Sequence, residues 1–125
     1  MMKNTRELGN NIEDIAVGFL EDNDIEVLDR NYRLRSGEID IIGRDDKELI
    51  FIEVKGKTGI GYGYPYEMVT ATKKKKLILT AKKYLVENKL PVEGGISWRI
   101  DVISVDITTG KIEWFKNAVT QEKQG

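Results

Sequence analysis

Two neighbouring hydrophobic segments each carry acidic residues where a buried strand is expected. The segments are Gly37-Glu38-Ile39-Asp40-Ile41-Ile42 and Leu49-Ile50-Phe51-Ile52-Glu53-Val54-Lys55. Because side chains alternate between the two faces of a strand, Glu38 and Asp40 should share one face. By the same rule, Glu53 and Lys55 should share a face of the next strand. Charge among apolar side chains is costly unless it is paired or bound to a metal, so the fold must give these charges partners.

The rest of the pattern predicts an α/β domain. Apolar residues recur at helical spacing in two ranges, 5–23 and 70–88. Alternation and flanking turn residues predict strands at 25–28, 38–43, 48–55, 96–107 and 111–115. We therefore expect a mixed central β-sheet flanked by helices, in the order α-β-β-β-α-β-β. One domain should span residues 1–117, followed by a flexible tail at 118–125.

Composition limits the chemistry that is available. The 125 residues are 40% hydrophobic and 33% charged, which is typical of a soluble globular domain. There is no cysteine and no histidine, which excludes thiolate or histidine metal ligands and a histidine general base. Catalysis would have to use carboxylates, lysine, hydroxyls or a hard metal ion. The lack of cysteine suits a cytoplasmic protein, and no apolar run is long enough to require a membrane.

Positive charge is concentrated in the middle of the chain. Residues 30–83 contain 13 Lys and Arg against 7 Asp and Glu, although the whole chain has a net charge of −1. This asymmetry allows a basic face for a polyanion on an acidic protein. Chance clustering of solvated charge is the alternative.

A hairpin between the two acidic segments would bring Asp40 and Glu53 side by side. Two carboxylates, the backbone carbonyl of Val54 and water make an oxygen-only site of the kind that Mg²⁺ prefers. Such an ion polarises a phosphoryl oxygen and lowers the pKa of a bound water. Lys55 would orient that water or stabilise charge in the transition state. The alternative is a network of structural salt bridges in a protein-interaction domain.

Asp40 followed by Glu53-Val54-Lys55 resembles the PD-(D/E)XK nuclease motif in its form without the proline. More closely, the chain resembles the YraN-type family of bacterial proteins predicted to be endonucleases, which is similar to archaeal Holliday-junction resolvases. The matching positions are Glu13 with Ala16, Arg30-Asn31, Gly37 to Asp40, Phe51 to Lys55, Gly63-Tyr64-Pro65 with Glu67 and Val69, Lys73, and Arg99-Ile100-Asp101. The resemblance implies a restriction-endonuclease-like core and a DNA endonuclease dependent on Mg²⁺ or Mn²⁺. Asp40 and Glu53 would hold the metal, and Lys55 would be the catalytic lysine.

The resemblance also implies roles outside this motif. Glu13 matches a first-helix acid that completes the metal site in related resolvases; otherwise it is an exposed helix acid. Glu38 is either an acid that supports the metal ligands or a solvated edge residue. Ile12 stands where the family usually has glycine, and Lys57 stands where arginine is usual, which would weaken a bidentate phosphate contact. Related resolvases act as dimers, so a homodimer is expected.

Basic and aromatic residues are the candidates for nucleic-acid contact. Lys73 and Lys74 fall nearest the inward face of the second helix, so we expect them, with Lys57, to contact backbone phosphates. Lys75 and Lys76 should point away from that face. Positive charge at the start of a helix opposes the helix dipole, and an external anion would relieve that repulsion. Tyr62, in a glycine-rich loop, could stack on a base or pack on the domain.

The form of the substrate and the cleavage activity both stay open at this point. The substrate would be DNA, in a branched or single-stranded form, held mostly by its phosphates. The alternative function is a nucleic-acid-binding module that keeps the metal-site residues but does not cleave on its own.

Arg99 and Asp101 share a strand face and are expected to form a structural pair, with a DNA-facing Arg99 as the alternative.

Overall fold

The computed structural model describes residues 5–57, 69–90 and 96–120, with side chains from residue 11 onward. The elements are α1 (Thr5–Asp22), β1 (Glu26–Leu34), β2 (Gly37–Arg44), β3 (Glu48–Lys57), α2 (Ala71–Glu87), β4 (Ser97–Asp106) and β5 (Ile112–Val119). Their order is the predicted α-β-β-β-α-β-β. Neither helix in these ranges is long and apolar enough to cross a membrane.

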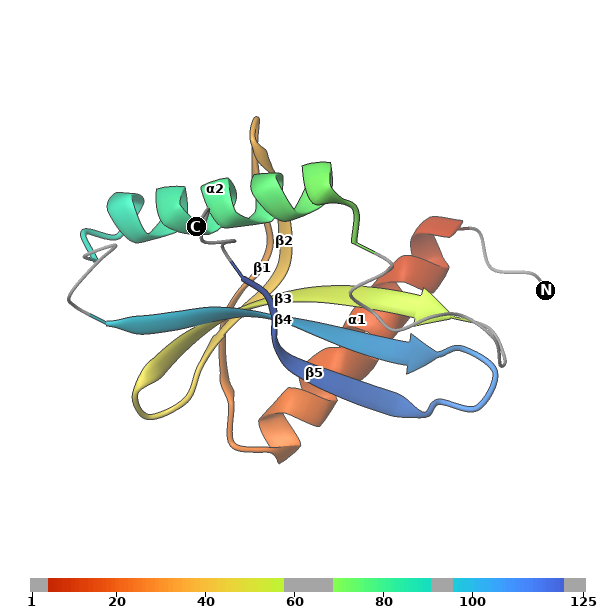
Figure 1. The fold of residues 1–125 in the computed structure, drawn as a ribbon. Coiled ribbons are helices and arrows are strands. Elements are labelled where there is room, and N and C mark those ends of the chain that lie inside the picture. Colours follow the sequence, from red (N-terminus) through yellow and green to blue (C-terminus); the bar gives the residue numbers. More distant parts are fainter. Residues whose placement is uncertain (1–4, 58–68, 91–95, 121–125) are drawn as a thin grey trace.

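The five strands form one mixed sheet in the order β1-β2-β3-β4-β5. The β3–β4 pair is parallel, and the other three pairs are antiparallel. Parallel neighbours need a crossover connection, and α2 provides it. Figure 1 shows α2 lying across one side of the sheet and α1 packed against the other. The predicted mixed α/β architecture is therefore confirmed.

Each helix covers its own hydrophobic cluster. Leu77, Ala81 and Leu85 of α2 pack with Phe51 of β3 and other apolar residues of the sheet. On the opposite face, Ala16 and Leu20 of α1 pack against a second cluster that includes Ile41, Ile50, Ile52 and Ile103. Burial of these two helical faces fixes the sheet between the helices, so β2, β3 and α2 have defined positions around the acidic residues.

Strands β1 and β5 are longer than the sequence predicted. β1 runs to Leu34 instead of Leu28, because its polar second half pairs with β2 at the edge of the sheet. β5 runs to Val119, which is buried and pairs with Ile100. The ordered chain thus continues past the expected boundary at residue 117, and residues 121–125 lie outside the described ranges.

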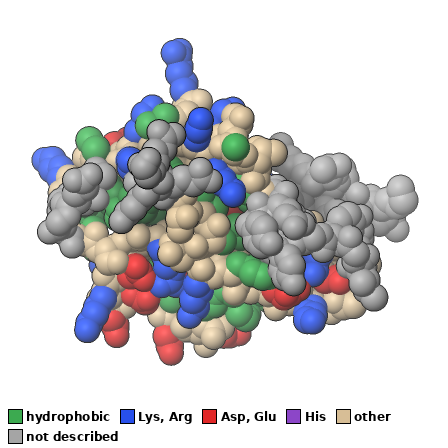
Figure 2. Space-filling view, in the orientation of Figure 1, with side chains coloured by type: hydrophobic (Ala, Val, Ile, Leu, Met, Phe, Trp, Pro, Cys, Tyr) green, Lys and Arg blue, Asp and Glu red, His purple; other side chains and the backbone are tan. Residues whose placement is uncertain are grey.

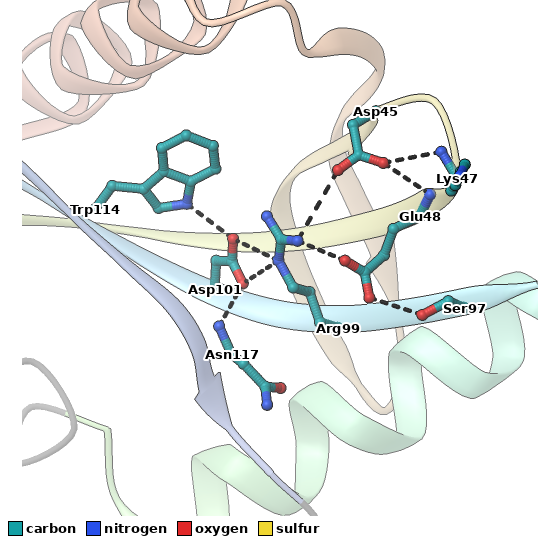
Figure 3. Close-up of polar contacts among 8 residues, drawn as sticks. All are labelled: Asp45, Lys47, Glu48, Ser97, Arg99, Asp101, Trp114 and Asn117. Atoms are coloured by element: carbon teal, nitrogen blue, oxygen red, sulfur yellow. Dashed lines mark hydrogen bonds and ion pairs between the residues drawn. The ribbon is translucent and has the colours of Figure 1, made fainter.

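Asp101 is the centre of a buried polar network that joins β3, β4 and β5 (Figure 3). Its carboxylate is 0% exposed and accepts hydrogen bonds from Arg99 Nε at 3.0 Å, Trp114 Nε1 at 2.8 Å and the Asn117 backbone N–H at 2.7 Å. Arg99 also donates to Glu48 at 2.5 Å. Arg99 and Asp101 therefore form the structural pair that the sequence favoured, and Arg99 is held inside the domain by two carboxylates.

Candidate metal and nucleic-acid site

Asp40 lies where β2 and β3 separate. The paired register of the two strands ends at Ile41 opposite Ile52. One position further on, Asp40 Oδ2 accepts a hydrogen bond of 2.8 Å from the Val54 backbone N–H. At this position β3 therefore donates its hydrogen bond to the Asp40 side chain instead of to the β2 backbone. This contact holds Asp40 beside Glu53. Val54 contributes its N–H here; the metal-ligand role of its carbonyl stays a prediction.

Glu53 is buried and is held by two lysines. Its Oε1 lies 2.6 Å from Lys73 Nζ and 3.4 Å from Lys55 Nζ. Lys55 follows on the same face of β3, as the alternation of the strand predicted. Lys73 comes from the first turn of α2, so the structure places this predicted phosphate-binding lysine on a carboxylate. The contact with Glu53 could not be found from spacing, since it depends on how α2 packs over the sheet.

The ionisation of these groups reflects their burial and their shared charges. Burial, and then the charge of Glu53, raise the pKa of Asp40 to about 7, although the Val54 N–H acts in the opposite direction. Burial and the neighbouring Lys73 lower the pKa of Lys55. For Lys73, burial lowers the pKa, but the hydrogen bonds to Glu53 and Lys55 and the negative charges of Glu53 and Asp40 together outweigh burial, and the pKa is raised. The positive charge near Asp40 is thus too small to offset the effects of burial and of Glu53 on its pKa.

A cavity of about 250 Å³ opens beside the two carboxylates, between β2, β3 and α2. It is lined by Gly37, Glu38, Asp40, Glu53, Lys73, Lys76 and Leu77. Lys76 was expected to point away from the site. It nevertheless lines the cavity, because it lies one helical turn after Lys73, and i, i+3 spacing would have identified it. Gly37, with φ of 154°, brings the β1–β2 turn close to α2, where a Cβ would lie 3.2 Å from Thr80 Oγ1.

Asn31 joins Glu13 of α1 to Glu38, which also lines the cavity, in a second polar group. The Asn31 amide, oriented to suit its neighbours, donates to Glu13 Oε1 at 3.2 Å and to Glu38 Oε1 at 3.3 Å. Arg30 lies 3.8 Å from Glu13 and 2.7 Å from Asp14. Asn31 has a positive φ of 54°, which asparagine tolerates better than most residues. The sequence pointed to Glu13 and Glu38 but gave no role to Asn31.

Two of the other candidates, Lys57 and Lys74, do not line the cavity beside the carboxylates. Lys57 Nζ lies 2.8 Å from Glu113 on β5, so its charge is already paired. Lys74 is half-buried on α2, next to Lys73. Tyr62 lies outside the described residues. Ile12 reaches across to Gly56 of β3, where a Cβ would lie 3.1 Å from Ile12 Cδ1, so this departure from the family pattern is accommodated by a glycine.

The donor groups suit a hard divalent cation. Asp40 and Glu53 offer carboxylate oxygens from adjacent strands, and the charge of Glu53 makes Asp40 harder to ionise, which a cation would relieve. Within the described part of the chain, no three acidic side chains converge closely enough to hold a metal. Glu13 therefore does not complete such a group here. Mg²⁺ binds through as few as one or two carboxylates when water and substrate phosphate supply its other ligands, so Asp40 and Glu53 fit that pattern.

The surface around α2 is basic. Figure 2 shows Lys and Arg side chains along the upper edge of the molecule, over α2 and the tip of the β1–β2 hairpin; most visible acidic side chains lie in the lower half, where they are mixed with other Lys and Arg side chains. Four of the lysines are consecutive, residues 73–76 at the start of α2. The basic face suggested by the charge distribution therefore borders the cavity that contains the acidic pair.

Comparison with known proteins places the chain in a family. The model of the Uncharacterised protein family UPF0102 matches residues 12–105. A UPF0102 protein of Clostridioides difficile is 40% identical over 115 residues, which are 92% of this chain and 98% of that protein. A relative from Dehalococcoides mccartyi is 38% identical over 124 residues, covering 98% of this chain and all of the relative (100%).

A solved structure, SfsA of Pyrococcus furiosus in complex with Ca²⁺, is similar at a TM-score of 0.37 and 18% identity, over 94% of this chain and 66% of that chain. The family model spans every acidic and basic residue of the site described above, from Glu13 to Lys76. The chain belongs to the UPF0102 family, the YraN-type proteins that its motifs resemble.

Proposed function

We propose that this protein is a metal-dependent nuclease that hydrolyses phosphodiester bonds in DNA, with Mg²⁺ or Mn²⁺ as its cofactor. The observation that carries the proposal is the meeting of Asp40, Glu53 and Lys55 at the point where β2 and β3 separate. A cavity beside the two carboxylates gives a substrate phosphate access to them. The predicted branched or single-stranded DNA substrate, the cytoplasmic location and the homodimer are parts of the same proposal.

Each residue has a task that follows from its position. Asp40 and Glu53 would hold the cation, which when bound polarises the phosphoryl oxygen and acidifies water. Asp40 is fixed by the Val54 N–H, so its carboxylate does not need to be ordered at the moment of binding. Lys55, close to Glu53 and with a lowered pKa, would orient the attacking water and stabilise negative charge on the phosphate.

The basic start of α2 would bind the nucleic-acid backbone. Lys74 and Lys76 stand beside the cavity or next to residues that line it, and the helix N-terminus adds its own positive potential. Contacts of this kind read phosphates and not bases. We therefore expect weak sequence preference and strong salt dependence.

A nucleic-acid-binding module without its own cleavage activity is the second candidate. Two observations favour it: Lys55 and Lys73 already neutralise Glu53, and in the described ranges no third acid joins Asp40 and Glu53. Such a protein would use the same basic face. It would bind DNA with a metal dependence but release no product.

A cleavage assay separates the two candidates. Labelled single-stranded, duplex, flapped and four-way-junction DNA would be incubated with Mg²⁺, Mn²⁺ or chelator. Wild type would be compared with Lys55→Ala and with Lys75→Ala, which removes the same charge from an exposed position on α2. Metal-dependent cutting that Lys55→Ala abolishes and Lys75→Ala keeps supports the nuclease. Equal cutting by all three indicates a contaminant, and tight binding without product supports the binding module.

A further inference from the structure

Two lysines from different elements converge on one oxygen of Glu53, and they differ in how easily they can leave it. Lys55 is attached two residues away on the same strand, and its side chain is 24% exposed. Lys73 makes the shorter contact, 2.6 Å, although its side chain is 41% exposed. Rotation about its own side-chain bonds would carry the Lys73 ammonium group from Glu53 into solvent without moving the backbone.

The position of Lys73 in α2 gives it a second natural partner. Thr70 is the N-cap of α2, and the first turn contains no acidic residue. The helix dipole is positive at this end and repels the ammonium group. Glu53 offsets that repulsion in the structure, and a phosphate group at the helix start would also offset it. Glu53 and a phosphate therefore compete for the same ammonium group.

A cation bound by Asp40 and Glu53 would compete in turn with Lys73. Lys73, Asp40 and Glu53 line the same cavity. A divalent cation at Glu53 would stand close to the Lys73 ammonium group, and like charges at a buried carboxylate repel each other strongly. Entry of the cation and departure of Lys73 from Glu53 are thus favourable together and unfavourable separately.

We propose that Lys73 is an exchange residue: it neutralises Glu53 in the absence of metal and transfers to a backbone phosphate when a divalent cation binds. The inference rests on the proposed metal and nucleic-acid site and adds a coupling between its two ligands. Since such coupling is reciprocal, metal tightens nucleic-acid binding and nucleic acid tightens metal binding. The protein then assembles its complete site only when both are present.

The test measures metal binding without nucleic acid. Wild type, Lys73→Met and Lys75→Met would be titrated with Mn²⁺ by calorimetry, with thermal melting to confirm that each is folded. Both variants lose one positive charge from α2, but Lys75 is exposed and does not line the cavity. Losing a charged hydrogen bond to Glu53 should lower the Kd of Lys73→Met for Mn²⁺ about tenfold. The Kd of Lys75→Met should stay within about twofold of wild type.

Two further arms complete the test. Lys73→Arg keeps a positive charge beside Glu53, so the Mn²⁺ affinity of this variant should not exceed that of wild type. Anisotropy of a labelled four-way junction, checked to be intact, should show a larger gain in DNA affinity on adding Mn²⁺ for wild type than for Lys73→Met.

Equal Mn²⁺ affinity of Lys73→Met and Lys75→Met, or weaker binding by Lys73→Met than by wild type, would overturn the exchange role. If Asp40→Asn abolishes Mn²⁺ binding in that case, the proposed metal site survives without the coupling. If neither wild type nor Lys73→Met binds Mn²⁺, the exchange role and the metal site fail together. Binding by Lys73→Met alone would support the exchange role.

Discussion

Replacing Asp40 by asparagine should stabilise the metal-free protein, and the gain should grow as the pH rises. Burial and Glu53 raise the pKa of Asp40 from 3.8 to about 7. Between these two pH values the folded protein binds more protons than the unfolded chain, so the free energy of unfolding falls as the pH rises. The asparagine side chain does not ionise, and this loss of stability should disappear in the variant.

The size of the effect follows from the same pKa. A difference of about three pH units, at about 1.4 kcal/mol each, corresponds to about 4 kcal/mol when Asp40 is fully ionised in the folded state. At pH 5 Asp40 is ionised in the unfolded chain and still protonated in the folded protein, which already accounts for a little over one of these pH units. The advantage of Asp40→Asn over wild type should therefore increase by about 2–3 kcal/mol between pH 5 and pH 8.5.

Urea unfolding in chelator, followed by tryptophan fluorescence, measures this increase. Asp46→Asn is the matched control, because Asp46 is an exposed carboxylate in the β2–β3 turn. Its free energy of unfolding should follow that of wild type at every pH. A constant difference between Asp40→Asn and wild type across this pH range, or a difference that shrinks as the pH rises, would refute the view that the site holds an uncompensated carboxylate.

Further predictions concern the frame of the site and its surface. Asp101→Ala leaves Arg99 without its buried partner and should lower the free energy of unfolding in urea by about 3–5 kcal/mol; a loss below about 1 kcal/mol would contradict the network. Gly37→Ala should cost about 1–3 kcal/mol, because it adds a Cβ in a strained, close-packed conformation. Gly18→Ala, whose Cβ meets nothing within 4 Å on α1, should instead raise the melting temperature. For DNA binding followed by anisotropy, Lys74→Met should reduce the salt dependence by about one phosphate contact; Lys57→Met should leave it unchanged, since Glu113 already pairs that charge.

The local pattern of apolar residues was sufficient to predict the helices and strands that have one distinct apolar face. Both helices and the two acidic strands repeat apolar residues at a regular period, and the structure has them at nearly the expected bounds. β1 and β5 were predicted too short because polar residues follow the apolar start of each strand, at 29–31 in β1 and at 116–117 in β5. In both, an asparagine with positive φ, Asn31 or Asn117, occurs within the strand, and each makes a hydrogen bond to a carboxylate that only the folded sheet brings near.

The candidate site was predictable to the extent that it follows from strand register. Asp40 and Glu53 come together because each lies next to the last paired residues of the β2–β3 hairpin, Ile41 and Ile52, and Lys55 follows by alternation. The contact of Lys73 with Glu53 depends on where α2 crosses the sheet, which packing of the hydrophobic clusters decides. Local sequence carries no signal for such a contact between a helix and a strand.

The central claim, that Asp40 and Glu53 together bind a divalent cation beside Lys55, is tested most directly by locating the metal. Crystals grown or soaked with Mn²⁺ would be measured for anomalous scattering, with Asp40→Asn crystals treated identically. In wild type we predict one anomalous peak, which marks a Mn²⁺ ion coordinated by both carboxylates. In the variant this peak should be absent. A wild-type structure in which Mn²⁺ lies elsewhere, or in which Lys73 still holds Glu53 at saturating Mn²⁺ with no peak between the carboxylates, would contradict the claim.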